Sequence, residues 1–331
     1  LILLYSRESI YLISVPVAAL IALFVIAGIR KSHLRPGRYF DFSMIISITI
    51  LPRVLWISNN VSPLQSDFYT YHTLAAALSR GEVIYERLIA LFPHLLGYPS
   101  FLSVFYRIFG SDVLVAILLN LSIGVASVLL VYYLVTELSD RRFGMISAVI
   151  LALWPSLIFY STVVATEALF TLLFLVVIVY FYRVRDCPSG IKAYLFYFLL
   201  GMLIGILNAV RPMGILLLIS IGAYLVITLS RESEYLRNLG KILLPFITLC
   251  MGYLISITMI KQSIQTITNR SVGTSFIGYS ILVGSNYEHS GTWNTDDANL
   301  LDEVYQDGFV PPDVVNSELL STAIDRILDD P

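Results

Sequence analysis

The sequence has few charged residues. Asp, Glu, Lys and Arg make up 13% of its 331 residues, whereas hydrophobic residues make up 57%. A soluble globular domain carries about a quarter charged residues and about half apolar ones. This shortage of charge, with a mean hydropathy of +0.80, excludes an ordinary soluble domain. It predicts an all-α polytopic membrane protein, and the net charge of −2 points to no class of partner until the charges are assigned to the two sides of the membrane.

Cysteine, metal-binding clusters and nucleotide motifs are also scarce or absent. Cys187 falls in a short polar loop and Cys250 in an apolar run, so no disulfide framework is implied. His72 and His94 have no Cys or second acid beside them and fall short of a metal signature. The sequence contains no Gly-rich phosphate loop and no Gly-X-Ser-X-Gly elbow. We therefore expect no metal, no cofactor, no nucleic-acid partner and no nucleotide-driven chemistry on the cytoplasmic side.

Long apolar runs give the chain its organisation. A membrane span needs about 20 mostly apolar residues. Eight runs of this kind are present, of which the second and fourth are short: Ile10–Ile29, Phe42–Ile57, Val113–Val135, Gly144–Tyr160, Thr162–Tyr182, Tyr194–Val210, Met213–Leu229 and Ile242–Ile260. The chain begins with Leu and stops at Asp-Asp-Pro within an expected helix, so we expect it to be the N-terminal fragment of a longer protein.

Basic residues predict which loops face the cytoplasm. Twelve of the 21 collect in every second loop: Arg30, Lys31, Arg35, Arg38, Arg141, Arg142, Arg183, Arg185, Lys192, Arg231, Arg237 and Lys241. Loops rich in Lys and Arg stay on the cytoplasmic side. Residues 59–112, and everything after Lys261, then lie outside. The predicted domains are a transmembrane part, 1–260, and an acidic extracytoplasmic segment, 261–331.

The outer loop 59–112 is long and carries helices of its own. HTLAAALSRG predicts a short amphipathic helix that ends at Gly81. YPSFLSVFYRIFG predicts a second, with aromatic residues on its membrane-facing side. A long loop with its own helices is more often functional than decorative.

Asp67 is the first candidate for chemistry. It follows directly on a predicted span, is the only acid between Asp41 and Glu82, and is flanked by Tyr69 and Tyr71. A carboxylate placed at the membrane surface is either an ordinary solvated charge or the working group of an enzyme that acts at that surface. The sequence leaves both readings open.

Two further charges fall near the outer ends of predicted helices. Glu167 lies five residues into an apolar helix, so it is buried, paired, facing a cavity, or a residue that snorkels to the interface. Arg211, beside Pro212, is either a phosphate ligand or an anchor to lipid headgroups. Arg53 and Arg107 are weaker examples of the same pattern.

Together these features resemble the GT-C glycosyltransferases, in particular the protein O-mannosyltransferase and aminoarabinose-transferase branch. The resemblance covers nearly the whole chain from Phe42 and rests on short motifs in a fixed order: QSDFYTYHTLAAALSRGEVIY, GYPSFLSVFYRIFGSD, STVVATEALF, LNAVRP, VGSNYEHSGTW and LLSTAIDRILDDP. Asp67 is followed by Phe68 and not by a second acid, and Pro99-Ser100 stands where the family often has Pro-Pro. The subfamily and the sugar stay open.

The resemblance implies a GT-C-type bundle that transfers a sugar from a polyprenyl-phosphate donor, with inversion, at the outer face of the cell membrane. Asp67 would be the general base and Glu167 a second catalytic residue. Arg211 would stabilise the leaving phosphate, and the implied substrate-binding set is completed by Tyr69, Tyr71, His94, Arg107 and Arg53. Beside membrane lipids, the expected partners are the donor and an acceptor, which is a protein, a lipid or a glycan.

Two other readings compete with this one. A transporter or lipid flippase would explain the predicted helices and place Glu167 in the substrate path. It would also predict two related halves with interrupted helices, and the sequence shows no such repeat. A membrane scaffold without chemistry would leave the helices of loop 59–112 unexplained.

Overall fold

The computed structural model describes residues 38–329, apart from 61, 83, 85–87, 186, 188–189, 231–239, 270, 274–275 and 306–309. Within these residues the chain is helical and contains no strand. The predicted helix Ile10–Ile29 lies outside the described residues, as do Arg30, Lys31, Arg35, Arg231 and Arg237 of the predicted cytoplasmic loops.

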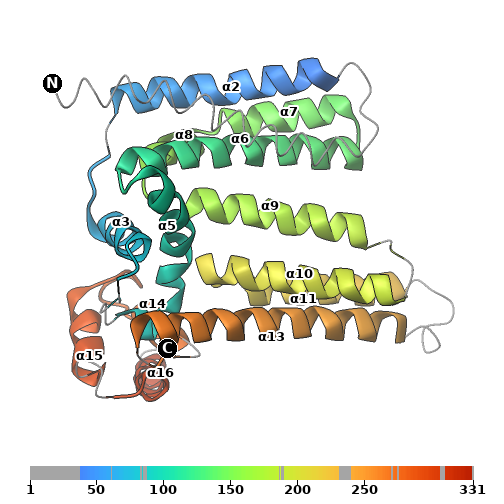
Figure 1. The fold of residues 1–331 in the computed structure, drawn as a ribbon. Helices are drawn as coiled ribbons and strands as arrows, with labels where there is room; N and C mark the ends of the chain where they lie inside the picture. Colours follow the sequence, from blue (N-terminus) through green and yellow to red (C-terminus); the bar gives the residue numbers. More distant parts are fainter. Residues whose placement is uncertain are drawn as a thin grey trace.

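Among the described residues, five long apolar helices form the body of the fold and run alongside one another (Figure 1). They are α2 (Arg38–Asn59), α6 (Val113–Leu138), α9 (Glu167–Val184), α10 (Ile191–Val210) and α13 (Gly240–Thr268). Each is long and apolar enough to cross a membrane. The shorter apolar helix α11 (Gly214–Ser230) lies beside α10 and α13. The protein is an all-α polytopic membrane protein, as the composition predicts.

The fourth predicted span is broken. Its residues form α7 (Arg141–Ala152), α8 (Pro155–Phe159) and the 3₁₀ turn η2 (Tyr160–Thr162), with a bend of 55° between the two parts. Pro155 occupies the first position of α8, where proline starts a helix but cannot continue the preceding one. With this bent pair counted as one span, the described residues contain up to six.

The fifth span begins later than predicted. Hydrogen bonds hold the residues before α9 out of a helix: Asn120 Nδ2 donates to the Val163 carbonyl at 2.8 Å, and the Ser62 and Thr162 hydroxyls lie 2.8 Å apart. Glu167 is therefore the first residue of α9, and the prediction that it lies five residues inside the helix is wrong.

Helices α10 and α13 pack closely because glycines lie between them. A Cβ atom on Gly201 would collide with the carbonyl oxygen of Leu249, and one on Gly252 with that of Phe198. Small residues let membrane helices approach backbone to backbone. The pair forms one wall of the larger cavity described below.

The remaining helices gather at one end of the bundle, which we call the α3 end (Figure 1). They are α3 (Ser66–Ser79), α4 (Leu88–Leu91), the 3₁₀ turn η1 (Pro93–Leu96), α5 (Gly97–Phe109), α14 (Ile277–Gly284), α15 (Thr295–Tyr305) and α16 (Pro312–Asp329). The α6–α7 and α9–α10 turns, with the described Arg141, Arg142 and Arg185, lie at the opposite end. The elements of the predicted outer side therefore share one end.

The two loop helices pack on each other through aromatic side chains. Tyr98 and Tyr106 of α5 are buried against α3, where the Tyr106 hydroxyl lies 2.8 Å from His72 Nδ1 and the Tyr98 ring meets Tyr71 edge-on. The prediction that the aromatic side chains of α5 face the membrane is wrong for these two, because they belong to a hydrophobic core with α6 and α9. Helix α3 begins at Ser66, earlier than the predicted HTLAAALSRG segment.

The C-terminal helices pack on the outer loop. Leu282, Leu301 and Leu319 of α14–α16 form one core with Ala90 and Leu91 of α4, and Gly273 N donates to the Ala90 carbonyl at 2.8 Å. Helix α13 continues to Thr268, past the predicted domain boundary at residue 260. The C-terminal segment and the 59–112 loop thus support each other.

The start of α5 lies against the end of α10. A Cβ atom on Gly97 would collide with the Ala209 carbonyl group, although the backbone of Gly97 is helical and suits any residue (φ −61°, ψ −54°). This close approach fixes the loop helix beside the last turn of α10.

Replacing Gly97 by Ala is expected to destabilise the protein by about 1–3 kcal/mol, the usual cost of overpacking. The unfolding temperature in detergent should fall accordingly. Gly284→Ala is the matched control because a Cβ atom there would meet no other atom within 4 Å. Equal melting temperatures for the two variants would contradict the close approach.

Candidate active site

An ion pair joins α9 to the end of α10. Arg211 Nη2 donates to Glu167 Oε1 at 2.6 Å, and Arg211 Nε donates to Thr166 Oγ1 at 3.2 Å. The side chain of Arg211 remains 43% exposed and that of Glu167 29%. Glu167 Oε2 is buried and has no hydrogen-bond partner among the described residues. The pair is therefore open on one side, and both members keep capacity to bind another group.

Local sequence explains why Arg211 points away from its own helix. It precedes Pro212, which disfavours a helical conformation at the residue before it, and its backbone is extended (φ −144°, ψ 133°). Asn208 Oδ1 then accepts a hydrogen bond from Gly214 N at 2.9 Å, closing the turn into α11. The sequence LNAVRPMG thus ends α10 and presents the guanidinium at the α3 end.

Helix α3 brings Asp67 and Tyr71 to this pair. They lie one turn apart and so on one face of the helix. Burial, together with the charges of Asp67 and Glu167, raises the pKa of Tyr71 to about 12, while the charge of Arg211 acts in the opposite direction. All three charges therefore act on the same phenol. Asp67 itself is exposed and makes no hydrogen bond with another described side chain.

A cavity of about 260 Å³ lies where these elements meet. Its lining comes from α3, η1, α9 and the α10–α11 turn: Tyr71, His94, Thr166, Phe170, Val210, Arg211, Pro212 and Met213. A second cavity, of about 490 Å³, lies between α10, α13 and residues 272–273 and 276–277. Its lining is mostly apolar, with Asn208, Thr258 and Lys261 among the polar members. Because His94 and Pro212 line both cavities, the two are neighbours.

His94 occupies the boundary between the cavities. Its ring lies 5.0 Å from the ring of Phe276, centre to centre, and its Nδ1 is buried without a hydrogen-bond partner. Burial, and then the charge of Arg211, lower the pKa of His94 below its ordinary value. His94 is accordingly neutral near pH 7.

Three predicted site residues do not join this group. Tyr69 is 56% exposed on a different face of α3 from Asp67 and Tyr71. Arg107 is exposed in the last turn of α5. Arg53 lines a separate cavity. Conversely, Thr166, Phe170 and Lys261 border the cavities without having been predicted.

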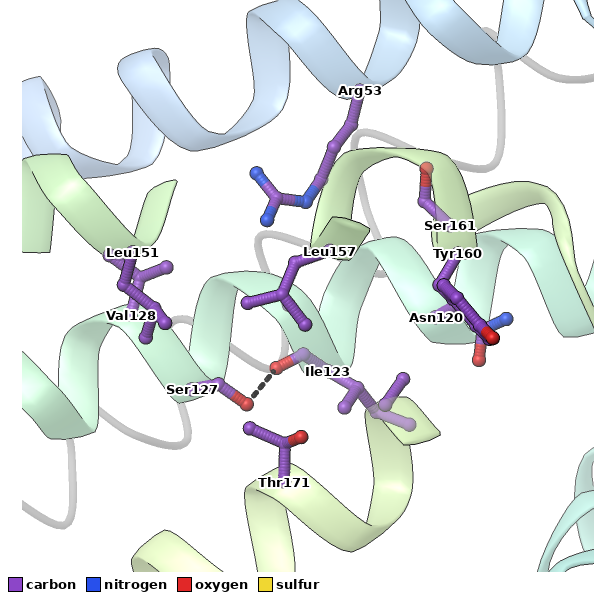
Figure 2. A pocket seen from close by; sticks show the side chains of 12 residues that line it. Arg53, Asn120, Ile123, Ser127, Val128, Leu151, Leu157, Tyr160, Ser161 and Thr171 are labelled. Carbon is purple, nitrogen blue, oxygen red and sulfur yellow. Dashed lines mark hydrogen bonds between the residues drawn. The ribbon is translucent and has the colours of Figure 1, made fainter. Parts of the chain in front are cut away.

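Figure 2 shows the separate cavity that Arg53 lines. The side chain is 1% exposed, and its Nη1 donates to the carbonyls of Thr49 at 2.9 Å and Ala152 at 2.8 Å. Ala152 is the last residue of α7, so the cation caps the carbonyl end of the helix at the break. A Cβ atom on Gly124 would lie 3.2 Å from Arg53 Nε, so glycine leaves the space that the guanidinium needs.

No three His, Cys, Asp or Glu side chains gather closely enough to hold a metal ion within the part of the chain that the structure describes. His72 is bound to Tyr106, whereas His94 lies among aromatic rings. Metal-independent chemistry stays a prediction.

Comparison with known proteins gives one match. Residues 94–257, just under half of the chain, match the family described as dolichyl-phosphate-mannose-protein mannosyltransferase. The chain is a membrane glycosyltransferase of the GT-C type. His94, Glu167 and Arg211 lie within the matched residues, and Asp67 and Tyr71 precede them. No curated protein and no solved structure matches the chain.

Replacing Arg53 by Met is expected to lower the unfolding temperature of this glycosyltransferase in detergent. The substitution leaves the buried carbonyl of Ala152 without its donor, which costs about 1–3 kcal/mol. Arg107→Met, which removes an exposed arginine, is the control and should leave the temperature unchanged. An Arg53→Met protein as stable as the control would show that Arg53 does not hold the α7–α8 break.

Proposed function

We propose that this glycosyltransferase moves a sugar from a polyprenyl-phosphate donor to an acceptor at the extracytoplasmic face of the membrane. Asp67 acts as general base and Arg211 binds the leaving phosphate. The observation that carries this proposal is that the charges of Asp67, Glu167 and Arg211 all act on Tyr71. Tyr71 and Arg211 line a cavity beside a larger, mostly apolar one.

The two neighbouring cavities suit the two parts of such a donor. The apolar space between α10 and α13 matches a prenyl chain, which enters from the bilayer. The phosphate then lies towards the smaller cavity, where the guanidinium of Arg211 stays 43% exposed beside its ion pair with Glu167. A guanidinium is well suited to a phosphate because it donates two parallel hydrogen bonds.

Asp67 suits the role of base because it is exposed and is not engaged with another described side chain. It accepts the proton of the acceptor hydroxyl or amine, which attacks the anomeric carbon. The bond from that carbon to the phosphate oxygen breaks, and the phosphate keeps the electron pair. A single displacement inverts the anomeric configuration. Glu167 holds Arg211 in place and thereby positions the phosphate.

The rival assignment of Glu167 to a transport path receives less support. Glu167 begins α9 and is paired with an arginine at the α3 end, whereas a coupling carboxylate in a transporter faces a path near the middle of the membrane. The family match also favours sugar transfer.

Asp67→Asn is expected to reduce sugar transfer by a factor of about 10² to 10⁴, the usual contribution of a general base. The measurement is transfer of labelled sugar from polyprenyl-phosphate donors in membranes that carry the full-length protein. Glu303→Gln removes a carboxylate that is exposed on α15 and is the matched control, with wild-type activity expected.

Wild-type transfer by Asp67→Asn would overturn the assignment of the base. Absence of transfer from every polyprenyl-phosphate donor in the wild type, with acceptors supplied as crude lysate, would overturn the donor class.

A further inference from the structure

His94 is the one polar side chain that lines both cavities among the residues that the structure describes. Its Nδ1 is buried and has no partner among those residues, although a buried polar atom ordinarily has one. A group that spans from the apolar cavity to Arg211 passes directly beside this imidazole. The unpartnered nitrogen therefore marks a place where a bound group completes the hydrogen bonding.

Arg211 is the charge that acts on His94, and it disfavours an imidazolium there. Among the described residues, seven charged or titratable side chains of the surrounding elements line one of the two cavities or interact with a residue that does. They are Arg211, Lys261, Tyr71, Tyr98, Tyr253, Asp67 and Glu167. Glu167 forms an ion pair with Arg211. Lys261 lines the larger cavity, as His94 does. An imidazolium at His94 would be opposed by the positive charge of Arg211.

A bound phosphate acts on His94 in the opposite direction to Arg211. A polyprenyl-phosphate sugar is a phosphodiester with one negative charge, and the polyprenyl phosphate that remains after transfer is a phosphomonoester with up to two. The second charge appears on the oxygen released from the anomeric carbon. A negative charge close to an imidazole favours its protonated form.

The following inference rests on the proposed function. We propose that His94 takes up a proton when the donor phosphodiester becomes the leaving polyprenyl phosphate. Its imidazolium then binds that phosphate together with Arg211. The protons balance over one turnover. The acceptor loses one proton to Asp67, which returns it to the solvent, and His94 takes one from the solvent. His94 releases its proton again when the polyprenyl phosphate leaves.

The consequence is that product binding is linked to a proton and donor binding is not. Between pH 7 and 8 free His94 is neutral and a free phosphomonoester is mostly a dianion. The complex then holds one proton more than its separated parts. Affinity for the product should fall about tenfold over that pH unit, as one linked proton requires.

The experiment measures inhibition of sugar transfer by polyprenyl phosphate at pH 7 and pH 8, in membranes that carry the full-length protein. The monomethyl ester of the same lipid phosphate is the matched inhibitor, because as a phosphodiester it has one charge at both pH values. For the wild type we expect the inhibition constant of the polyprenyl phosphate to rise about tenfold and that of its methyl ester to stay constant.

His94→Gln keeps a hydrogen-bond donor but cannot take up a proton, so its inhibition constants should be the same at both pH values. His72→Gln is the matched control, because His72 bonds to Tyr106 and lines neither cavity. It should keep the wild-type dependence.

Three outcomes would overturn the inference. They are equal wild-type constants at the two pH values, an equal rise for the methyl ester, and an unchanged pH dependence in His94→Gln. If His94→Gln does not fold, the comparison of the two inhibitors on the wild type decides. Failure of the proposed function gives a distinguishable result, because the wild type would then transfer no sugar from any polyprenyl-phosphate donor.

Discussion

The ion pair between Glu167 and Arg211 is the interaction around which the α3 end is arranged. It contributes little to stability, because a partly exposed pair at 2.6 Å is typically worth about 1 kcal/mol or less. Its importance is geometric. It joins the first residue of α9 to the residue that ends α10, and it sets the direction of a guanidinium that lines the smaller cavity. In the proposed function, the donor phosphate binds on the open side of this pair.

The rest of the fold fixes the position of this pair relative to the outer loop. Gly97 brings the start of α5 against the last turn of α10, next to Arg211. Packing of α5 on α3 then carries Tyr71 to the same cavity, with Asp67 one helical turn before it. Helices α14–α16 support the outer loop through their contacts with α4. Residues far apart in the sequence thus meet because the loop is packed as firmly as the bundle.

Much of this architecture could be predicted from the sequence. Hydropathy located the described spans, because each must present about 20 apolar residues to the bilayer. Asp67, Glu167 and Arg211 could be selected because a charge beside an apolar run is unusual. The break before Glu167 could not be predicted, because it depends on hydrogen bonds that involve Asn120 and Ser62, which are distant in the sequence.

The role of individual site residues was harder to foresee. Tyr69 and Tyr71 are equivalent neighbours of Asp67 in the sequence, and only the helical geometry of α3 separates the buried one from the exposed one. His94 could be selected as a loop histidine, but its place between two cavities is a tertiary property. Lys261 lies where the apolar run of α13 gives way to polar residues, and nothing local indicates that it borders a cavity.

The most direct test of this arrangement is a double-mutant cycle on the ion pair, with Glu167→Gln, Arg211→Gln and the double variant compared by kcat/KM for the polyprenyl-phosphate donor. If Glu167 acts by holding Arg211, the loss in the double variant will be smaller than the two single losses combined, with a coupling of about 0.5–3 kcal/mol. Strictly additive losses would show that the two residues act independently and would contradict the central role given to the pair.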